Sequence, residues 1–337
     1  MDDRLLPLLE CPRDHTDLRL QDGDLYCASG HRYPVVGGVP IFLLAEKDQT
    51  IGVARASLEA PERTADAPLY VETLGISDEL KRRVEKAWIA GGKIDPAVAH
   101  LIGATSGLGY VHRIGRLSAY PIPEISVGDG NGELLLDVGS SWGRWAVSAA
   151  RKGWRVVAID PSLGALLAAQ RAFPEFSSNI YRVCGDARFL PFKPGIFCCA
   201  FSYSVIQHFS ESDAELAIAE LGRVLHRGGF AKIQMAHRGG LRSTYSRTRR
   251  NYQNSGPFRV RYWSLAAMRD AFEKNVGPAH LAPEAFGGLG LLSEDRNLVS
   301  PAARAATAIS ELLKRLSVAL PALIKFADSV YVIATKR

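Results

Sequence analysis

The stretch LLLDVGSSWGRW, Leu134 to Trp145, decides the fold of this chain. An apolar strand runs directly into a turn that carries Gly139 and Gly143, which let the backbone turn sharply and approach a ligand closely. Residues 144–151 then predict a helix whose N-terminus faces that ligand. About twenty residues further on, VVAIDPS places Asp160 where a carboxylate holds ribose hydroxyls. Together these stretches indicate a βαβ unit that handles a nucleotide.

From Glu133 onward, strand and helix patterns alternate, which predicts a doubly wound α/β fold with a parallel sheet and helices on both faces. The expected strands are LLLDVG, RVVAID, IYRVCGD, FCCAFSYS and FAKIQMA, and ADSVYVIATK adds one at the C-terminus. Ser212 and Glu215 have capping-box spacing ahead of a helix over 214–226. Residues 302–326 predict a helical stretch that Pro321 interrupts.

In an open parallel sheet the ligand lies beyond the carboxyl ends of the strands, where strand order reverses. The residues there resemble class I S-adenosylmethionine-dependent methyltransferases, whose first motif runs D/E-x-G-x-G-x-G; here the middle glycine is Ser141. The resemblance covers about residues 131–236 and the final strand. It implies S-adenosylmethionine as cofactor, with Asp160 on the ribose and Asp186 accepting from the adenine amino group. The candidate cofactor-binding residues are Asp137, Gly139, Ser140, Ser141, Gly143, Asp160, Pro161, Asp186, Ala187 and Ser202.

The turn has two other interpretations. A glycine turn with a distal carboxylate also suits a nicotinamide dinucleotide, but the chain lacks the G-x-G-x-x-G fingerprint, and its GDARFLPF and SVIQHF segments fit the methyltransferase layout. The other is a doubly wound domain that binds no cofactor.

Methyl transfer from a sulfonium depends chiefly on positioning the acceptor in line. Where the acceptor is a hydroxyl, a base helps, and His208 follows the fourth strand at a place that faces the acceptor in this fold. Tyr203 is the second candidate catalytic residue, placed to orient substrate or cofactor. The competing interpretation of His208 is that it caps or packs the start of the next helix.

The N-terminal stretches LLPLLECPRDH and LYCASGHRYPVVGGVPIFL resemble the zinc-ribbon-like domain that activates tRNA and release-factor methyltransferases. Such modules bind zinc through two ligand pairs on facing hairpins. Here the resemblance implies Cys11, Asp14, Cys27 and His31 as ligands. Because Asp14 stands where a second cysteine is expected, a degenerate module without an ion is an equal alternative.

The chain divides into three predicted parts: the module over residues 1–45, a linker and helical lid over 46–130, and the methyltransferase domain over 131–337. Insertions are expected at about 237–263 and 288–326. No apolar run is long enough to span a membrane and Met1 precedes two aspartates, so we expect a cytoplasmic protein without a secretory signal.

Charge is unevenly distributed, with 12 basic and 17 acidic side chains in residues 1–100 and 29 basic and 18 acidic in the remainder. Residues 221–261 contain no acid, and the arginines of 237–263 alternate with aromatic side chains, which favours an anionic partner. A solvated loop without a ligand is the alternative. An apolar stripe between Ala302 and Phe326 is expected to pack on its own domain, over the sheet or the acceptor pocket; otherwise it lies on a membrane surface, in peripheral contact.

The leading functional hypothesis is a methyltransferase acting on a small molecule, a glycan or a lipid-linked anionic intermediate. The pI of 9.1 and the zinc-like module favour an RNA methyltransferase as the runner-up, although the N-terminal region is acidic. A third hypothesis is a non-catalytic partner protein that uses the same fold as a docking surface.

Overall fold

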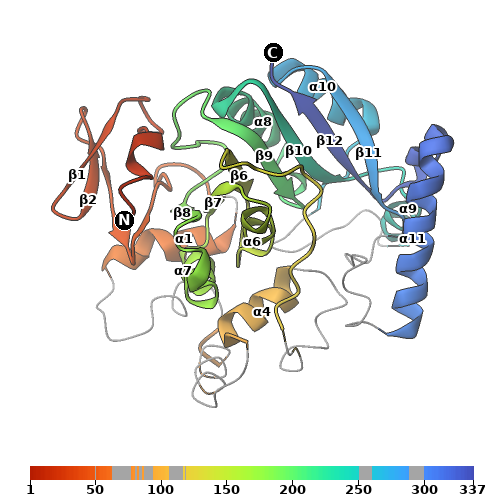
Figure 1. Ribbon diagram of the computed structural model, residues 1–337, viewed down its shortest axis with the longest axis horizontal. Coiled ribbons are helices and arrows are strands. Elements are labelled where there is room, and N and C mark those ends of the chain that lie inside the picture. The colour runs from red at the N-terminus through yellow and green to blue at the C-terminus, as the bar shows by residue number, and fades with distance from the viewer. Residues whose placement is uncertain are drawn as a thin grey trace.

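The computed structural model describes residues 1–49, 51–62, 77–79, 82, 86, 94–105, 117, 119–249, 260–287 and 300–337. Its centre is a seven-stranded sheet of order β11-β12-β10-β9-β6-β7-β8 (Figure 1). Strands β8, β7, β6, β9 and β10 are parallel, whereas β12 runs antiparallel to both β10 and β11. The strands span Leu134–Val138 (β6), Arg155–Asp160 (β7), Ile180–Cys184 (β8), Phe197–Tyr203 (β9), Leu225–Ala236 (β10), Ala279–Ala285 (β11) and Ser329–Thr335 (β12).

Helices cover both faces of this sheet, so the predicted doubly wound α/β architecture is confirmed. Leu135 and Leu136 point to opposite faces because side chains alternate along a strand. Leu135 packs in a core with Ala146 and Ala168, whereas Leu136 belongs to a core with Ile218 and Phe272. The helices are Arg144–Arg151 (α6), Leu163–Ala172 (α7), Glu211–Val224 (α8), Leu241–Arg249 (α9), Leu265–Asn275 (α10) and Pro301–Ala319 (α11), with 3₁₀ turns at Pro174–Phe176 (η3), Ile206–His208 (η4) and Pro321–Phe326 (η6).

The sequence placed one cap wrongly and missed one strand. Helix α8 begins at Glu211, and its cap is Ser210, whose hydroxyl accepts from the amide of Asp213, rather than Ser212. Strand β11 was not predicted because AHLAPEA lacks a β-type alternation and contains Pro283, which a strand tolerates at an outer position of a sheet.

The N-terminal residues form two small sheets of their own. Strands β1 (Leu18–Gln21), β2 (Asp24–Cys27) and β3 (Arg32–Tyr33) form one, and β4 (Val35–Val36) pairs with β5 (Val39–Pro40) in the other. Tight turns at Asp22-Gly23 and Gly37-Gly38 connect β1 to β2 and β4 to β5, with positive φ at all four residues. A 3₁₀ turn, η1, spans Leu6–Leu8.

This N-terminal module continues the hydrogen bonding of the large sheet. Ile41 bridges Cys184 of β8 in parallel fashion, and the amide of Phe42 donates to the Cys184 carbonyl at 2.7 Å. On its other side, Leu9 forms an antiparallel bridge with Phe192. The module is therefore anchored to the strand that neighbours the predicted ribose carboxylate.

Only part of the predicted lid falls within the described residues. Helix α1 (Gly52–Glu59), followed by η2 (Ala60–Glu62), packs near α7, and α4 (Pro96–Thr105) also contacts α7. Residues 63–76 and 106–116, most of 80–93, residues 250–259 of the basic segment and residues 288–299 lie outside the description.

Helix α11 and η6 confirm a helical stretch that Pro321 interrupts. Leu313, Leu323 and Ile324 pack on the core as expected, but the rest of the apolar stripe does not. Ile309, Leu312, Leu316 and Leu320 are exposed, so the stripe does not close over the sheet along these residues. Periodicity shows that a stripe exists without showing which way it points.

Candidate functional site

The turn after β6 has the conformation that its glycines predict. Gly139 has φ 75°, Ser141 has φ 47° and Gly143 has φ 84°. A Cβ on Gly139 would lie 2.2 Å from Val205 Cγ2, so glycine there also makes room for the segment after β9. At Gly143 the nearest atom would be 3.5 Å away, so the left-handed backbone is what requires glycine.

Asp160 ends β7 and is fixed by backbone amides from both directions. Ser141 N donates to Oδ2 at 2.8 Å, and Ser162 N donates to Oδ1 at 2.9 Å. Each carboxylate oxygen still has a lone pair to offer, so the side chain is held in place and remains able to accept from hydroxyls.

Two buried carboxyl groups therefore meet at this edge of the sheet. Asp137 is 1% exposed and Asp160 is 8% exposed. Burial raises the pKa of Asp137 to about 8, and the nearby Asp160 adds to the rise. Burial also raises the pKa of Asp160 to about 6, although hydrogen bonds from the amides of Ser162 and Ser141 favour its ionised form.

Several buried polar atoms in this turn lack a hydrogen-bond partner among the described residues. They are Asp137 Oδ2, Ser140 Oγ and Ser141 Oγ. Buried polar groups are almost always satisfied, so atoms such as these mark a place where a polar ligand completes the network. The turn thus fits a ligand that carries hydroxyl or amino groups.

Asp186 is already engaged by a neighbouring arginine. Arg188 Nη2 donates to Asp186 Oδ2 at 2.7 Å, and Arg188 Nη1 donates to Asp213 Oδ1 at 3.0 Å. Asp186, with Ala187 beside it, is buried after β8 as predicted, but its oxygens are oriented by this guanidinium. The role of Asp186 toward adenine stays a prediction.

Ser57 of α1 fastens the loop after β7 and was not found from the sequence. Its hydroxyl donates to the Pro161 carbonyl at 2.7 Å and accepts from the Leu163 amide at 2.9 Å. Ser57 is fully buried. No local motif signals it, because its partners lie more than a hundred residues away.

The remaining predicted residues lie on β9 and the segment that follows it. Ser202 is fully buried and donates to the Val138 carbonyl at 2.9 Å, so its hydroxyl ties β9 to β6. The ring of Tyr203 lies 4.9 Å from that of Trp145, within an aromatic cluster. Ser204, with φ 61°, donates to Gln234 Oε1 at 2.7 Å. Ser204 is not among the residues predicted from the sequence.

His208 is the last residue of η4. Arg261, which lies near the C-terminal end of the basic segment 237–263, forms hydrogen bonds with the backbone of this turn. Arg261 Nη1 donates to the His208 carbonyl at 2.7 Å, and Arg261 N donates to the Gln207 carbonyl at 2.8 Å. The half-buried His208 thus sits at the carboxyl end of β9 on a fixed backbone. Its role as a base stays a prediction.

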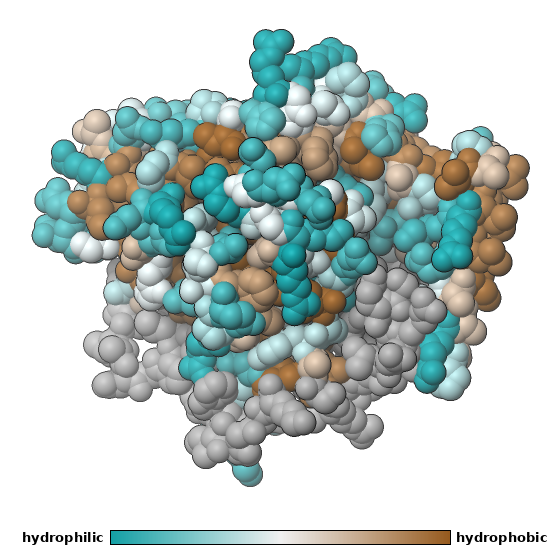
Figure 2. Space-filling model, viewed as in Figure 1, coloured by the Kyte–Doolittle hydropathy of each residue, from teal (hydrophilic) through white to brown (hydrophobic). Residues whose placement is uncertain are grey.

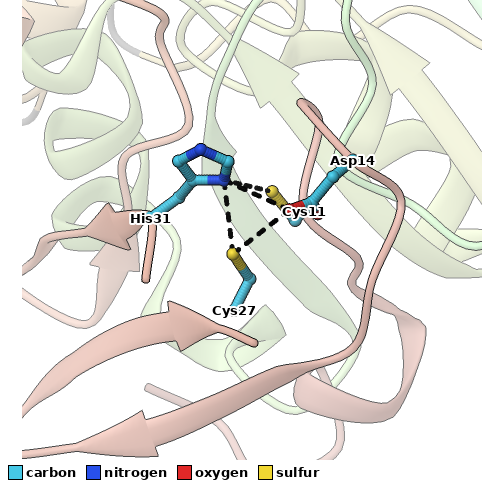
Figure 3. A group of neighbouring side chains, drawn as sticks. All are labelled: Cys11, Asp14, Cys27 and His31. Carbon is cyan, nitrogen blue, oxygen red and sulfur yellow. Dashed lines mark hydrogen bonds and ion pairs between the residues drawn. The ribbon is translucent and has the colours of Figure 1, made fainter. Parts of the chain in front are cut away.

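The four predicted metal ligands lie together in the N-terminal module (Figure 3). Their ligand atoms are all within 4.8 Å of one another. His31 Nδ1 lies 3.4 Å from Cys11 Sγ, 3.3 Å from Cys27 Sγ and 3.3 Å from Asp14 Oδ2. Zinc bonds of about 2.0 to 2.3 Å in a tetrahedron separate ligand atoms by about 3.3 to 3.8 Å, and the three distances from His31 fall in this range.

The surroundings of this cluster connect it to the large domain. Burial raises the pKa of the Cys11 thiol, whose sulfur lies 3.1 Å from the hydroxyl of Tyr33. The adjacent Glu10 pairs with Arg223 of α8 at 2.7 Å and with His15 at 2.7 Å. Glu10 thus links the segment that carries Cys11 to helix α8.

Comparison with known proteins identifies the central segment. Residues 135–229 match the family model described as a methyltransferase domain. The predicted resemblance to methyltransferases is confirmed over this segment, which contains the turn after β6, Asp160 and Asp186.

Individual relatives cover limited parts of this chain. The biotin biosynthesis bifunctional protein BioHC of Cellvibrio japonicus is 37% identical over 99 residues, which are 29% of this chain and 19% of that protein. Demethylmenaquinone methyltransferase of Thermobifida fusca is 36% identical over 101 residues, 29% of this chain and 42% of that protein. The chain thus spans less than half the length of either relative.

A solved structure of phosphoethanolamine N-methyltransferase 2 from Haemonchus contortus, in complex with S-adenosylmethionine, superimposes with a TM-score of 0.42. It is 20% identical and the match covers 61% of this chain and 49% of that one.

Proposed function

We propose that this protein is an S-adenosylmethionine-dependent methyltransferase that acts on a small molecule, a glycan or a lipid-linked intermediate. The observation that carries the proposal is the edge formed by β6 and β7. There a left-handed turn with unsatisfied buried hydroxyls faces a carboxylate, Asp160, that two amides hold in place. The match of residues 135–229 to a methyltransferase domain supports it.

The residues that would hold the cofactor follow from this edge. Asp160 would accept from ribose hydroxyls, the turn from Gly139 to Gly143 would enclose the methionine part with Asp137 behind it, and Asp186 would lie toward adenine. S-adenosylmethionine supplies a methyl group on a sulfonium sulfur. Pro161, Ala187 and Ser202 would lie at the walls of the site, since they follow β7, follow β8 and lie on β9.

On the acceptor side, the chain itself has to orient the nucleophile and accept its proton. His208 would take that proton from a hydroxyl acceptor, because its segment is fixed by Arg261 at the carboxyl end of β9. Tyr203, held against Trp145, would present its hydroxyl to substrate or cofactor from the same strand. Closure of these groups over the acceptor would exclude water and fix the in-line approach.

Calorimetric titration with S-adenosylhomocysteine tests cofactor binding. We expect binding by the native chain and a loss of about tenfold or more for Asp160→Asn, since a charge-assisted hydrogen bond contributes about 1.5 to 3 kcal/mol. Asp129→Asn, at an exposed aspartate, is the matched control and should bind normally. No detectable binding by the native chain would support a non-catalytic docking protein instead.

The acceptor class is tested by salt dependence. If RNA is the acceptor, the affinity of the protein for RNA should fall steeply as salt concentration rises, because binding releases counterions from the phosphates. The acid-free run over residues 221–261 is the feature that keeps RNA as the second candidate. A weak salt dependence, together with a structure bearing S-adenosylhomocysteine and a small space beside its sulfur, would favour the small-acceptor reading.

We also propose that Cys11, Asp14, Cys27 and His31 bind a structural zinc ion, on the strength of their spacing. Metal analysis of protein purified without added zinc should give about one equivalent, and less than about a tenth would contradict the site. Cys27→Ser should lower the zinc content. Cys198→Ser, at a cysteine outside the cluster, should not.

A further inference from the structure

Helix α11 turns its apolar side away from the protein. Ile309, Leu312, Leu316 and Leu320 recur every three or four residues and therefore lie on one side of the helix. They are 59%, 56%, 44% and 57% exposed, respectively. Figure 2 shows this side as a brown band along the outer edge of α11.

The opposite side of α11, which packs toward β11, is mostly polar, and Leu313 is its partly buried apolar contact with the core. Thr307, Ser310 and Ser317 are buried there. Ser310 Oγ accepts from the amide of Phe286 at 2.9 Å, and Lys314 lies 3.9 Å from a carboxylate oxygen of Glu284. A surface helix of a globular protein ordinarily buries its apolar side, whereas α11 leaves most of its large apolar side chains exposed.

The exposed apolar side chains gather in one region. Eight of the ten large apolar side chains that are exposed among the described residues belong to α9, to α11 or to the turn that follows it. Scattered single residues need no explanation, but a contiguous patch marks an interaction surface. We call this set the apolar face: Leu241, Tyr245, Ile309, Leu312, Leu316, Val318, Leu320 and Phe326.

Positive charge borders the apolar face. Residues 301–326 contain four basic side chains and one acid, Glu311, which gives a net charge of +3. Arg304, Arg315 and Lys325 are exposed and form no ion pair with any described residue. Apolar side chains flanked by lysine and arginine are the pattern of helices that lie in the surface of an anionic bilayer.

The same charge argues against a second copy of the chain as the occupant. A two-fold contact would bring each patch against itself and oppose two segments of net charge +3. An anionic surface instead gains from each basic side chain near it. In the described part of the chain no helix has the length and apolar character needed to cross a bilayer.

The apolar face also lies on the functional side of the sheet. Ser329, which follows η6 closely, pairs with Ala236 at the carboxyl end of β10, and the amide of Ser243 in α9 donates to Asp328 Oδ1 at 2.7 Å. The end of η6 and the start of α9 therefore lie beside the carboxyl end of β10, at the edge where β6, β7 and β9 present the candidate site (Figure 1).

We propose that the apolar face of α9, α11 and η6 binds the surface of anionic lipid bilayers, with its leucines inserted among the acyl chains and its basic side chains on the headgroups. This inference does not depend on the proposed methyltransferase activity, because binding is measured without cofactor or acceptor.

Flotation of the full chain with lipid vesicles tests the proposal. We expect the protein to float with vesicles of phosphatidylcholine mixed with phosphatidylglycerol, and to float less with phosphatidylcholine alone or at high salt. The double variant Leu312→Glu, Leu316→Glu should bind at least about tenfold more weakly, since it removes two apolar side chains that would be buried among the acyl chains.

A matched control separates membrane binding from a general effect of added acid. Leu20→Glu with Leu216→Glu makes the same change at two exposed leucines on β1 and α8 and should float like the native chain. Unchanged thermal midpoints would show that both variants fold. Failure of the native chain to bind either vesicle, or equal binding by the α11 variant, would overturn the proposal. So would a dimer in sedimentation that Leu312→Glu, Leu316→Glu dissociates while vesicles bind nothing.

Discussion

The backbone amide of Ser141 donates a 2.8 Å hydrogen bond to Oδ2 of Asp160. One contact thus joins the turn after the first strand of the sheet to the carboxylate that ends the second. Ser141 reaches this position only with a positive φ, so the local backbone and the orientation of the carboxylate are fixed together.

Replacing Ser141 with glycine should keep this contact and relieve the backbone. A non-glycine residue in the left-handed region costs the native state about 1 to 2 kcal/mol, and glycine avoids this cost. Glycine also increases the conformational entropy of the unfolded chain, which lowers the free energy of unfolding by about 0.5 to 1 kcal/mol. We therefore expect Ser141→Gly to raise the free energy of unfolding by up to about 1 kcal/mol in urea titrations. Ser177→Gly, where φ is −58°, should lower it, and a lower value for Ser141→Gly would refute the strain.

The buried carboxyl pair predicts a pH dependence of stability without ligand. The pKa values of about 6 for Asp160 and about 8 for Asp137 lie above the usual value of about 3.9. The native state therefore binds more protons than the unfolded state in this range, and stability should fall as pH rises from about 4 to about 8. Asp137→Asn should flatten the upper part of the curve and be more stable than the native chain at pH 8, by about 1 kcal/mol or more. The prediction is contradicted if, in chemical denaturation, the free energy of unfolding of Asp137→Asn and of the native chain depends on pH in the same way.

From the contacts of Ser57 we predict that helix α1 supports the loop after β7, where the cofactor would bind. Ser57→Ala leaves the Leu163 amide without its partner, which costs about 1 to 3 kcal/mol for a buried group. We expect that loss in unfolding free energy and weaker binding of S-adenosylhomocysteine by calorimetry. Ser212→Ala, at an exposed serine, is the control. Unchanged affinity in the Ser57 variant would limit its role to stability.

His208 predicts a separation between binding and turnover. His208→Ala should leave the affinity for S-adenosylhomocysteine intact and reduce the rate of methyl transfer to a hydroxyl acceptor by about a hundredfold or more. The control is His280→Ala on the outermost strand, β11, at an exposed histidine. If His208→Ala turns over normally, the residue only packs or caps the segment before α8.

Local sequence patterns predicted much of the fold and part of the candidate site. The apolar runs that end in Asp137 and Asp160 predicted strands β6 and β7, because a buried parallel strand needs a continuous apolar sequence. The resemblance of the N-terminal stretches to a zinc-ribbon-like domain implied Cys11, Asp14, Cys27 and His31 as one ligand set, and the structure brings these four side chains together.

Long-range contacts could not be predicted in this way. The bond from Ser57 to Pro161 joins residues that no periodic pattern relates, and the capture of Asp186 by Arg188 depends on side-chain direction. The apolar stripe of α11 was visible as a period, but its outward direction depends on which polar groups find partners on β11.

The bridge between Ile41 and Cys184 has a consequence for solubility. Without it, β8 would present a row of unpaired amides and carbonyls on which another chain could add a strand. On the opposite flank, Pro283 of β11 removes a donor and so discourages the same addition. The N-terminal module therefore shields the sheet from pairing with other copies, and a chain shortened to begin after Phe42 should aggregate.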